Sequence, residues 1–162
     1  MKVAILSDIH DNIWVLRDLL AGLTADVLIF CGDFCAPFVL TQIAEGFAGP
    51  VHAVLGNNDG DELLLARNAA RFPHVTLHGQ FAELELDGRQ VAVTHYPHIG
   101  RALARGDVYD LVCHGHSHER LIEQVGSTLR VNPGEVMGRL GLSSYALYDT
   151  ATGQATFETM TG

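Results

Sequence analysis

Short runs of apolar residues recur along the chain, and polar or glycine residues bound each of them. Their length and composition favour buried β-strands over helices. The five clearest runs are residues 3–6, 27–31, 51–55, 91–93 and 111–113.

Segments with helical periodicity separate the first of these strands. Asn12 is suited to cap a helix whose apolar face comprises Ile13, Leu16, Leu20 and Leu23. A second helix is predicted from Pro37 to Phe47, with proline in its first turn, and a third from Asp61 to Arg71. Since each helix lies between two strands, we expect parallel strands joined by right-handed crossovers.

The second half of the chain is patterned as hairpins. Asp87-Gly88 predicts a tight turn between strands at 83–86 and 90–94. Two further strand pairs are expected at 120–125 with 128–131 and at 145–148 with 155–159. Strand–helix units followed by hairpins predict an α/β fold of two mixed sheets packed face to face, with helices outside.

The composition is that of an ordinary globular domain. The chain has 162 residues, 48% of them hydrophobic, and we expect one domain over residues 1–162. No apolar run is long enough to span a bilayer, and the N-terminus lacks the pattern of a signal peptide, so we expect a cytoplasmic protein without a membrane partner. Cys31, Cys35 and Cys113 form no metal or disulfide motif and are interpreted as reduced thiols, although Cys35 is close enough to Asp33 to face a site there.

The net charge of the chain indicates which kinds of substrate or partner it can bind. The formal net charge is −9, which argues against binding to long nucleic acid and favours small phosphorylated substrates. Lys2 is the only lysine, so almost all basic residues are arginines. Arg101 and Arg105 stand out because the guanidinium fork suits phosphate.

Polar clusters follow the predicted strands directly. Each has an ordinary explanation when taken alone, as a turn or a surface histidine. Because the carboxyl ends of neighbouring strands converge on one crevice, their joint order is more informative. They supply seven oxygen and nitrogen donors, enough for a site with two metal ions: Asp8, His10, Asp33, Asn57, His95, His116 and His118.

The order Asp-x-His, Gly-Asp, Gly-Asn-x-Asp, His, Gly-His-x-His resembles that of the calcineurin-like metallophosphoesterases. The likeness is to their small single-domain prokaryotic phosphodiesterase branch, and it extends to about Gly134 through Asn132-Pro133-Gly134. The resemblance implies a four-layer αββα sandwich and a dinuclear centre. One ion would be held by Asp8, His10, Asp33 and His118, and the other by Asp33, Asn57, His95 and His116.

The same resemblance implies the chemistry. Two divalent transition-metal ions would share a hydroxide that attacks the phosphorus of a small phosphoester. The ligand types suit Mn²⁺, Fe, Zn²⁺, Ni²⁺ or Co²⁺ without choosing among them, and Mn²⁺ is the expected ion. We expect hydrolysis of phosphodiesters, and hydrolysis of phosphomonoesters as a further activity.

Asn58 departs from the pattern of many relatives, which have histidine there. Asparagine donates a hydrogen bond but is no acid at neutral pH, so substrates with good leaving groups should be favoured. His98 is the nearest candidate to replace the acid, and a surface loop histidine is an equal interpretation of it. The remaining histidines match no ligand position, and among them His114 is a candidate to support the ligands: His52, His74, His78 and His114.

Three other classes of protein are alternatives to a calcineurin-like phosphoesterase. A non-catalytic scaffold of the same fold, like the retromer vacuolar sorting subunit, is the main alternative; retention of all seven donors favours an enzyme. A metallo-β-lactamase-like enzyme would place its His-x-His-x-Asp-His run early, and a haloacid-dehalogenase-like phosphatase would need an aspartate at His10. Exposed edge strands would permit a homo-oligomer.

Overall fold

Two mixed β-sheets form the centre of the molecule. The structure is a computed structural model that describes residues 1–160. One sheet has the order β11 (Gln154–Thr159), β10 (Ser144–Asp149), β1 (Lys2–Leu6), β2 (Val27–Phe30), β3 (Val51–Ala53) and β4 (Val75–Leu77). The other has the order β5 (Phe81–Leu86), β6 (Arg89–Thr94), β7 (Leu111–Cys113), β9 (Thr128–Pro133) and β8 (Arg120–Val125).

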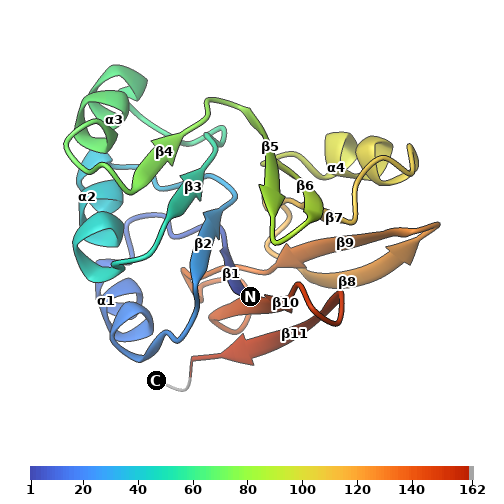
Figure 1. Ribbon diagram of the computed structural model, residues 1–162. Helices are drawn as coiled ribbons and strands as arrows, with labels where there is room; N and C mark the ends of the chain where they lie inside the picture. Colours follow the sequence, from blue (N-terminus) through green and yellow to red (C-terminus); the bar gives the residue numbers. More distant parts are fainter. Residues whose placement is uncertain (161–162) are drawn as a thin grey trace.

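The helices lie outside the two sheets. The helices α1 (Ile13–Gly22), α2 (Pro37–Gly46) and α3 (Glu62–Ala69) flank the six-stranded sheet, and α4 (Pro97–Ala104) flanks the five-stranded one (Figure 1). This arrangement confirms the expected four-layer αββα sandwich.

The alternation of side chains along β1 explains the layers. Ala4 and Leu6 belong to the apolar core beneath α1–α3, whereas Val3 and Ile5 belong to the core between the sheets. Because successive residues of a strand point to opposite faces, a strand buried on both faces is apolar throughout. The unbroken apolar runs in the sequence have this cause.

Most predicted elements are confirmed within one or two residues. β1, β2 and β3 pair in parallel, as the strand–helix alternation predicted. Asn12 and Asp61 cap α1 and α3 by accepting hydrogen bonds from backbone N–H groups three residues on. The β5–β6 turn has φ of 53° at Asp87 and 79° at Gly88, the two positive values that a type I′ turn requires.

Two elements, β4 and α4, were not expected from the sequence. β4 has three residues and neither a buried run nor a clear alternation. α4 carries Gly100 in its middle, a poor helix former. The glycine is explained by packing, because a Cβ at that position would lie 2.9 Å from Cδ2 of the His114 ring.

None of the four helices in residues 1–160 has the length and apolar character needed to cross a membrane.

Candidate metal centre

The carboxyl ends of five strands meet at one edge of the sandwich. β1, β2 and β3 come from one sheet, and β6 and β7 come from the other. Each strand is followed within four residues by donors from the sequence-predicted set, which we call the metal-site cluster: Asp8, His10, Asp33, Asn57, His95, His116 and His118.

The first group of donors surrounds Nε2 of His10. This nitrogen lies 3.3 Å from Nε2 of His118 and 3.6 Å from Oδ1 of Asp8. Nε2 of His118 is 3.3 Å from the same Asp8 oxygen. One carboxylate oxygen and two imidazole nitrogens at this spacing can share one cation.

The second group surrounds the side-chain oxygen of Asn57. Its Oδ1 lies 3.0 Å from Nε2 of His95 and 2.7 Å from Nδ1 of His116. These two imidazole nitrogens are 3.2 Å apart. The amide adds an oxygen donor without adding charge to a site that already holds two buried aspartates.

Asp33 lies between the two groups. Its Oδ2 is 3.5 Å from Nε2 of His10 and 3.4 Å from Nε2 of His95. Burial opposes ionisation, but hydrogen bonds with His95 and Asn58 outweigh it and hold the pKa of the Asp33 carboxyl well below its usual range. The structure therefore brings all seven residues together, in the two groups expected from the sequence.

Asp8 supplies an independent test of whether a cation fits. The residue is fully buried, and its Oδ2 accepts a hydrogen bond from the backbone N–H of His116. Its Oδ1 has no hydrogen-bond partner among the described residues. A buried carboxylate oxygen without a donor is costly, and the positive charge of a metal ion at the first group would satisfy it.

The backbone of the cluster is strained. Asp8, His10, Asp33, His116 and His118 have φ between 43° and 71°, in the left-handed region that side chains other than glycine rarely adopt. Such conformations persist where the surroundings impose them, and they gather at functional sites. At these strand ends they turn the side chains toward a common point.

Two glycines permit the close approach of the loops. A Cβ at Gly56 would lie 2.1 Å from Oδ1 of Asp33, and one at Gly115 would lie 1.9 Å from Oγ of Ser7. Any larger residue would separate the strand ends. Glycine at these two positions is thus a packing requirement of the cluster.

Hydrogen bonds behind the ligands orient two of the imidazoles. Nδ1 of His95 lies 2.7 Å from the carbonyl oxygen of Cys31, and Nδ1 of His118 lies 2.6 Å from Oε2 of Glu135. Donation from Nδ1 leaves the Nε2 lone pair directed at the site, which is how metal-binding histidines are usually held.

Glu135 was missed by sequence reasoning. It is fully buried, and its Oε1 accepts hydrogen bonds from the backbone N–H groups of Leu140 and Gly141. Burial opposes the charge, but His118 and these two donors lower the pKa of the Glu135 carboxyl. It follows the Asn132-Pro133-Gly134 segment directly, which is the one signal that could have drawn attention to it.

The two residues proposed for the leaving-group side differ in position. The amide of Asn58 donates to Oδ2 of Asp33 at 2.8 Å, and its backbone N–H donates to Oδ1 at the same distance. His98 is exposed on α4, and its ring lies against Tyr96 with centroids 5.8 Å apart. The structure thus places Asn58 in contact with Asp33 of the cluster, and His98 at the surface of α4 in contact with Tyr96.

The other residues singled out in the sequence have separate positions. Cys35 does face the cluster, with its Sγ 3.3 Å from Nδ1 of His10, and the three cysteines are free thiols. His114 is buried next to the ligand loop, and burial lowers its pKa to about 4. His52 and His78 form a pair of their own, 3.1 Å apart, and His74 contacts the Ala44 carbonyl oxygen.

Comparison with known proteins gives one family. The model of the calcineurin-like phosphoesterase superfamily domain matches residues 1–153. The phosphodiesterase MJ0936 of Methanocaldococcus jannaschii is 31% identical over 156 residues, which cover 93% of each chain. The solved structure of an archaeal phosphodiesterase superposes with a TM-score of 0.89 at 28% identity, covering 99% of this chain and 100% of that one.

Proteins with low sequence identity to this chain share its fold. Vps29 from Entamoeba histolytica, in a crystal structure with zinc, superposes with a TM-score of 0.69 at 17% identity. The match covers 99% of this chain and 98% of that one, and at this identity it speaks for the architecture alone.

Proposed function

The chain belongs to the calcineurin-like phosphoesterase superfamily and is a phosphoester hydrolase, and from this we propose that it cleaves small phosphodiesters with two divalent cations bound by the metal-site cluster. Phosphomonoesters are a second substrate class within the same proposal.

The position of Asp33 carries the proposal. One carboxylate oxygen lies within 3.5 Å of a histidine nitrogen from each donor group. A carboxylate so placed can bridge two cations at the separation of roughly 3.5–4 Å that two-metal hydrolases use. A mononuclear site would need no ionised, buried aspartate between two complete sets of donors.

In this proposal the first ion is held by Asp8, His10, Asp33 and His118, and the second by Asp33, Asn57, His95 and His116. When bound, two such cations lower the pKa of water and neutralise charge on the phosphoryl oxygens during in-line displacement.

The residues around the cluster orient these donors. Glu135 fixes the tautomer of His118, and the Cys31 carbonyl fixes that of His95. Asn58 holds both carboxylate oxygens of Asp33 by hydrogen bonds and offers no acidic proton. Because Asn58 cannot protonate the leaving group, diesters with good leaving groups should react fastest, and exposed His98 is the remaining candidate for an acid.

Several finer points belong to the same proposal. The donors are imidazole, carboxylate and amide without thiolate, which suits Mn²⁺, Fe, Zn²⁺, Ni²⁺ or Co²⁺, and of these we propose Mn²⁺. The acidic chain suits a small substrate better than a nucleic acid polymer. Three free thiols suit the cytoplasm, and the family match over residues 1–153 suits a single domain. A homo-oligomer would be compatible with the exposed sheet edges.

A metal-binding scaffold without activity is the alternative function, since the same fold and the same seven donors would serve it. The two functions differ in turnover. A scaffold would bind Mn²⁺ in the cluster yet leave every phosphoester of a broad panel intact.

The test is the Asp33→Ala variant, with Mn²⁺ content and hydrolysis of a chromogenic diester as readouts. We expect the loss of both, because neither donor group keeps its shared carboxylate. Asp149→Ala, which removes an exposed carboxylate paired with Lys2, is the matched control and should behave like wild type.

Circular dichroism and thermal unfolding of both variants show whether Asp33→Ala is folded. Should it fail to fold, His116→Gln serves instead, because His116 is an exposed member of the cluster. A folded Asp33→Ala protein that still cleaves the diester at the normal rate would refute the dinuclear mechanism.

A further inference from the structure

A polar cavity lies beside the loop that carries His116 and His118. Its volume is about 270 Å³, and α4, β8, β9 and this loop line it. We call it the Arg130 pocket. Its polar lining includes Arg101, His114, Ser117, Arg120, Arg130 and Asn132.

Arg130 is the buried charge of this pocket. Its side chain is only 6% exposed, and its Nη2 pairs with Oε2 of Glu123 at 2.7 Å. Its Nε and Nη1 have no hydrogen-bond partner among residues 1–160. Buried N–H groups of a guanidinium are costly to leave unpaired, so two such groups beside a cavity point to an acceptor that enters it.

Further arginines surround the same space. Arg101 also lines the Arg130 pocket, and a neighbouring cavity of about 230 Å³ is lined by Arg101, Arg105 and Arg130. Arg120 forms part of the wall, but its guanidinium lies over the Phe157 ring, 5.4 Å from the ring centroid. Three arginines thus supply positive charge at two adjoining cavities of a chain whose formal net charge is −9. This part of the surface is therefore positively charged, and can attract an anion, although the chain as a whole is acidic.

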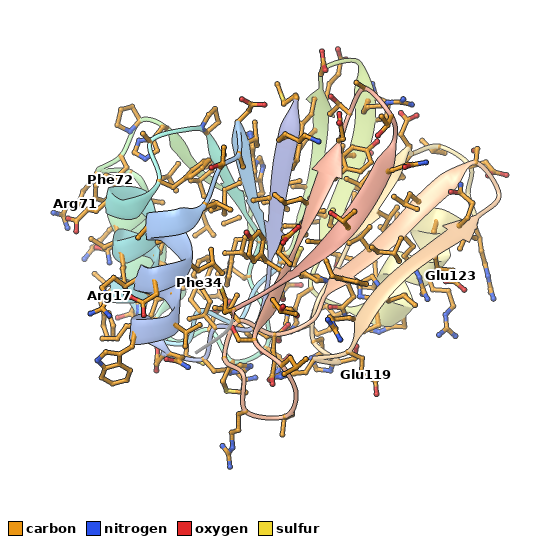
Figure 2. All side chains as sticks on the ribbon, turned by 90° about the horizontal axis from the view of Figure 1, so that it is seen from below. Arg17, Phe34, Arg71, Phe72, Glu119 and Glu123 are labelled. Atoms are coloured by element: carbon orange, nitrogen blue, oxygen red, sulfur yellow. The ribbon has the colours of Figure 1, made fainter. Side chains whose placement is uncertain are left out.

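Two carboxylates oppose this charge only in part. Glu119 lines the Arg130 pocket, and Glu123 lines the neighbouring cavity. Both lie on the β8 side of the molecule, away from α1–α3 (Figure 2). Glu123 is engaged by Arg130 and remains 46% exposed, whereas Glu119 is at the surface.

Neutral groups complete the lining next to the ligand loop. His114 is 2% exposed, and its Nε2 has no hydrogen-bond partner among the described residues. Asn132 is fixed by donating to the Gly115 carbonyl oxygen at 3.1 Å and to Oγ of Ser117 at 3.0 Å. Ser117 stands between His116 and His118 in the sequence, so the pocket and the metal-site cluster share one loop.

We propose that the Arg130 pocket binds a small oxyanion, with phosphate as the chemistry it fits. Guanidinium groups match phosphate oxygens in geometry and keep their charge at all physiological pH values. The anion would receive hydrogen bonds from the unpaired nitrogens of Arg130 and charge from Arg101. No metal ion and no hydrolysis are needed, so this site is independent of the proposed function.

The direct test is calorimetric titration of the full chain with inorganic phosphate, after divalent cations have been removed by chelation. Depletion ensures that phosphate does not bind through metal ions. We expect saturable binding of one phosphate with a Kd below about 10 mM. Sodium chloride of equal ionic strength should produce no such signal.

Variants locate the binding. Arg130→Gln should weaken phosphate binding by about tenfold or more, the loss of a charge-assisted contact. Arg101→Gln, at an exposed residue whose replacement spares the core, should weaken it by about threefold and stands in if Arg130→Gln fails to fold. Arg89→Gln is the matched control, because Arg89 pairs with Asp110 away from the pocket.

The proposal is overturned if wild-type protein shows no saturable phosphate binding. It is equally overturned if Arg89→Gln weakens binding as much as Arg101→Gln does, since the effect would then be general charge. Because the titration needs no turnover, a failure here is distinct from a failure of the hydrolase proposal.

Two sources of the phosphate can be separated by kinetics. A chromogenic diester that carries a second, non-reacting phosphate is compared with the same diester lacking it. If the pocket holds a group of the substrate, the second phosphate lowers KM in wild type and loses this effect in Arg101→Gln. If the pocket holds free phosphate, the two substrates have equal KM values while the calorimetric binding remains.

Discussion

Two pairs of histidines bring their ring nitrogens equally close in very different surroundings. Nε2 of His10 and Nε2 of His118 are 3.3 Å apart at the strand ends, and Nδ1 of His52 and Nε2 of His78 are 3.1 Å apart near β3 and β4. All four side chains are partly buried. The spacing of two imidazoles therefore does not by itself distinguish a metal site.

The neighbouring charges do distinguish the pairs. The nearby carboxylate of Asp8, 3.6 Å from Nε2 of His10, raises the pKa of His10, with Asp33 acting in the same direction. Burial lowers the pKa of His52 and of His78, and no carboxylate contributes to either shift. Neighbouring carboxylates make the His10–His118 pair a candidate cation site, whereas burial favours the neutral form of both rings in the His52–His78 pair.

The sharpest way to break this comparison is to remove each pair in turn. The double variant His10→Gln/His118→Gln should weaken Mn²⁺ binding by more than about 100-fold. Loss of a residue that only hydrogen-bonds to a metal ligand already costs up to about 100-fold, and this variant removes two ligands. His52→Gln/His78→Gln should leave Mn²⁺ binding and diester hydrolysis unchanged. Equilibrium dialysis with metal analysis measures both, and equal losses in the two variants would show that proximity of the rings is enough.

A smaller effect is expected from the support of one ligand. In Glu135→Gln the side-chain oxygen can still accept from Leu140 and Gly141, while its NH₂ group would donate to Nδ1 of His118. The imidazole would then carry its proton on Nε2, facing the cluster. We expect Mn²⁺ affinity to fall by about 10- to 100-fold with little change in thermal stability.

Competition with a chelating dye measures that affinity. Glu85→Gln, at an exposed residue of β5, is the matched control. Unchanged affinity in Glu135→Gln would show that His118 needs no help from its carboxylate partner.

The smallest effect is a pH dependence from the His52–His78 pair. Both rings have a pKa below the ordinary 6.5, so below pH 6.5 the unfolded chain binds more protons than the folded one. The pair should therefore lower the free energy of unfolding as the pH falls from 7.5 to 5.5, and contribute nothing above that range.

Chemical unfolding of wild type and His52→Gln/His78→Gln at the two pH values measures this contribution. The wild type should lose more stability on acidification than the variant does. An equal loss in both proteins would mean that the two rings titrate normally in the fold.

The donors could be located from the sequence because their order follows strand order. Asp8, Asp33 and His95 each come directly after a buried apolar run, and parallel strands bring such positions to one edge. The hairpin at Asp87-Gly88 was equally accessible, since its turn requires residues that tolerate positive φ. Local pattern and topology sufficed for both.

Other features depend on contacts that no local pattern records. Glu135 contacts His118 from a position 17 residues further along the chain, and the backbone N–H groups of Leu140 and Gly141 hold its other carboxylate oxygen. α4 forms although Gly100 weakens it, because the helix packs on the sheet and the glycine admits the His114 ring. The unpaired nitrogens of Arg130 likewise follow from its surroundings, and a sequence reports only that an arginine is present.

The left-handed backbone at five donor residues carries a cost for selection. A residue with a Cβ in that conformation is less favourable than glycine by about 1 kcal/mol. Replacing His10 or His116 by glycine should therefore raise the free energy of unfolding while removing an imidazole donor from the cluster. Cation binding returns stability only to the folded chain. Selection for a stable fold therefore favours glycine at these five positions, whereas selection for metal binding favours the present side chains. The more metal ion the cell supplies, the more of the lost stability binding would restore.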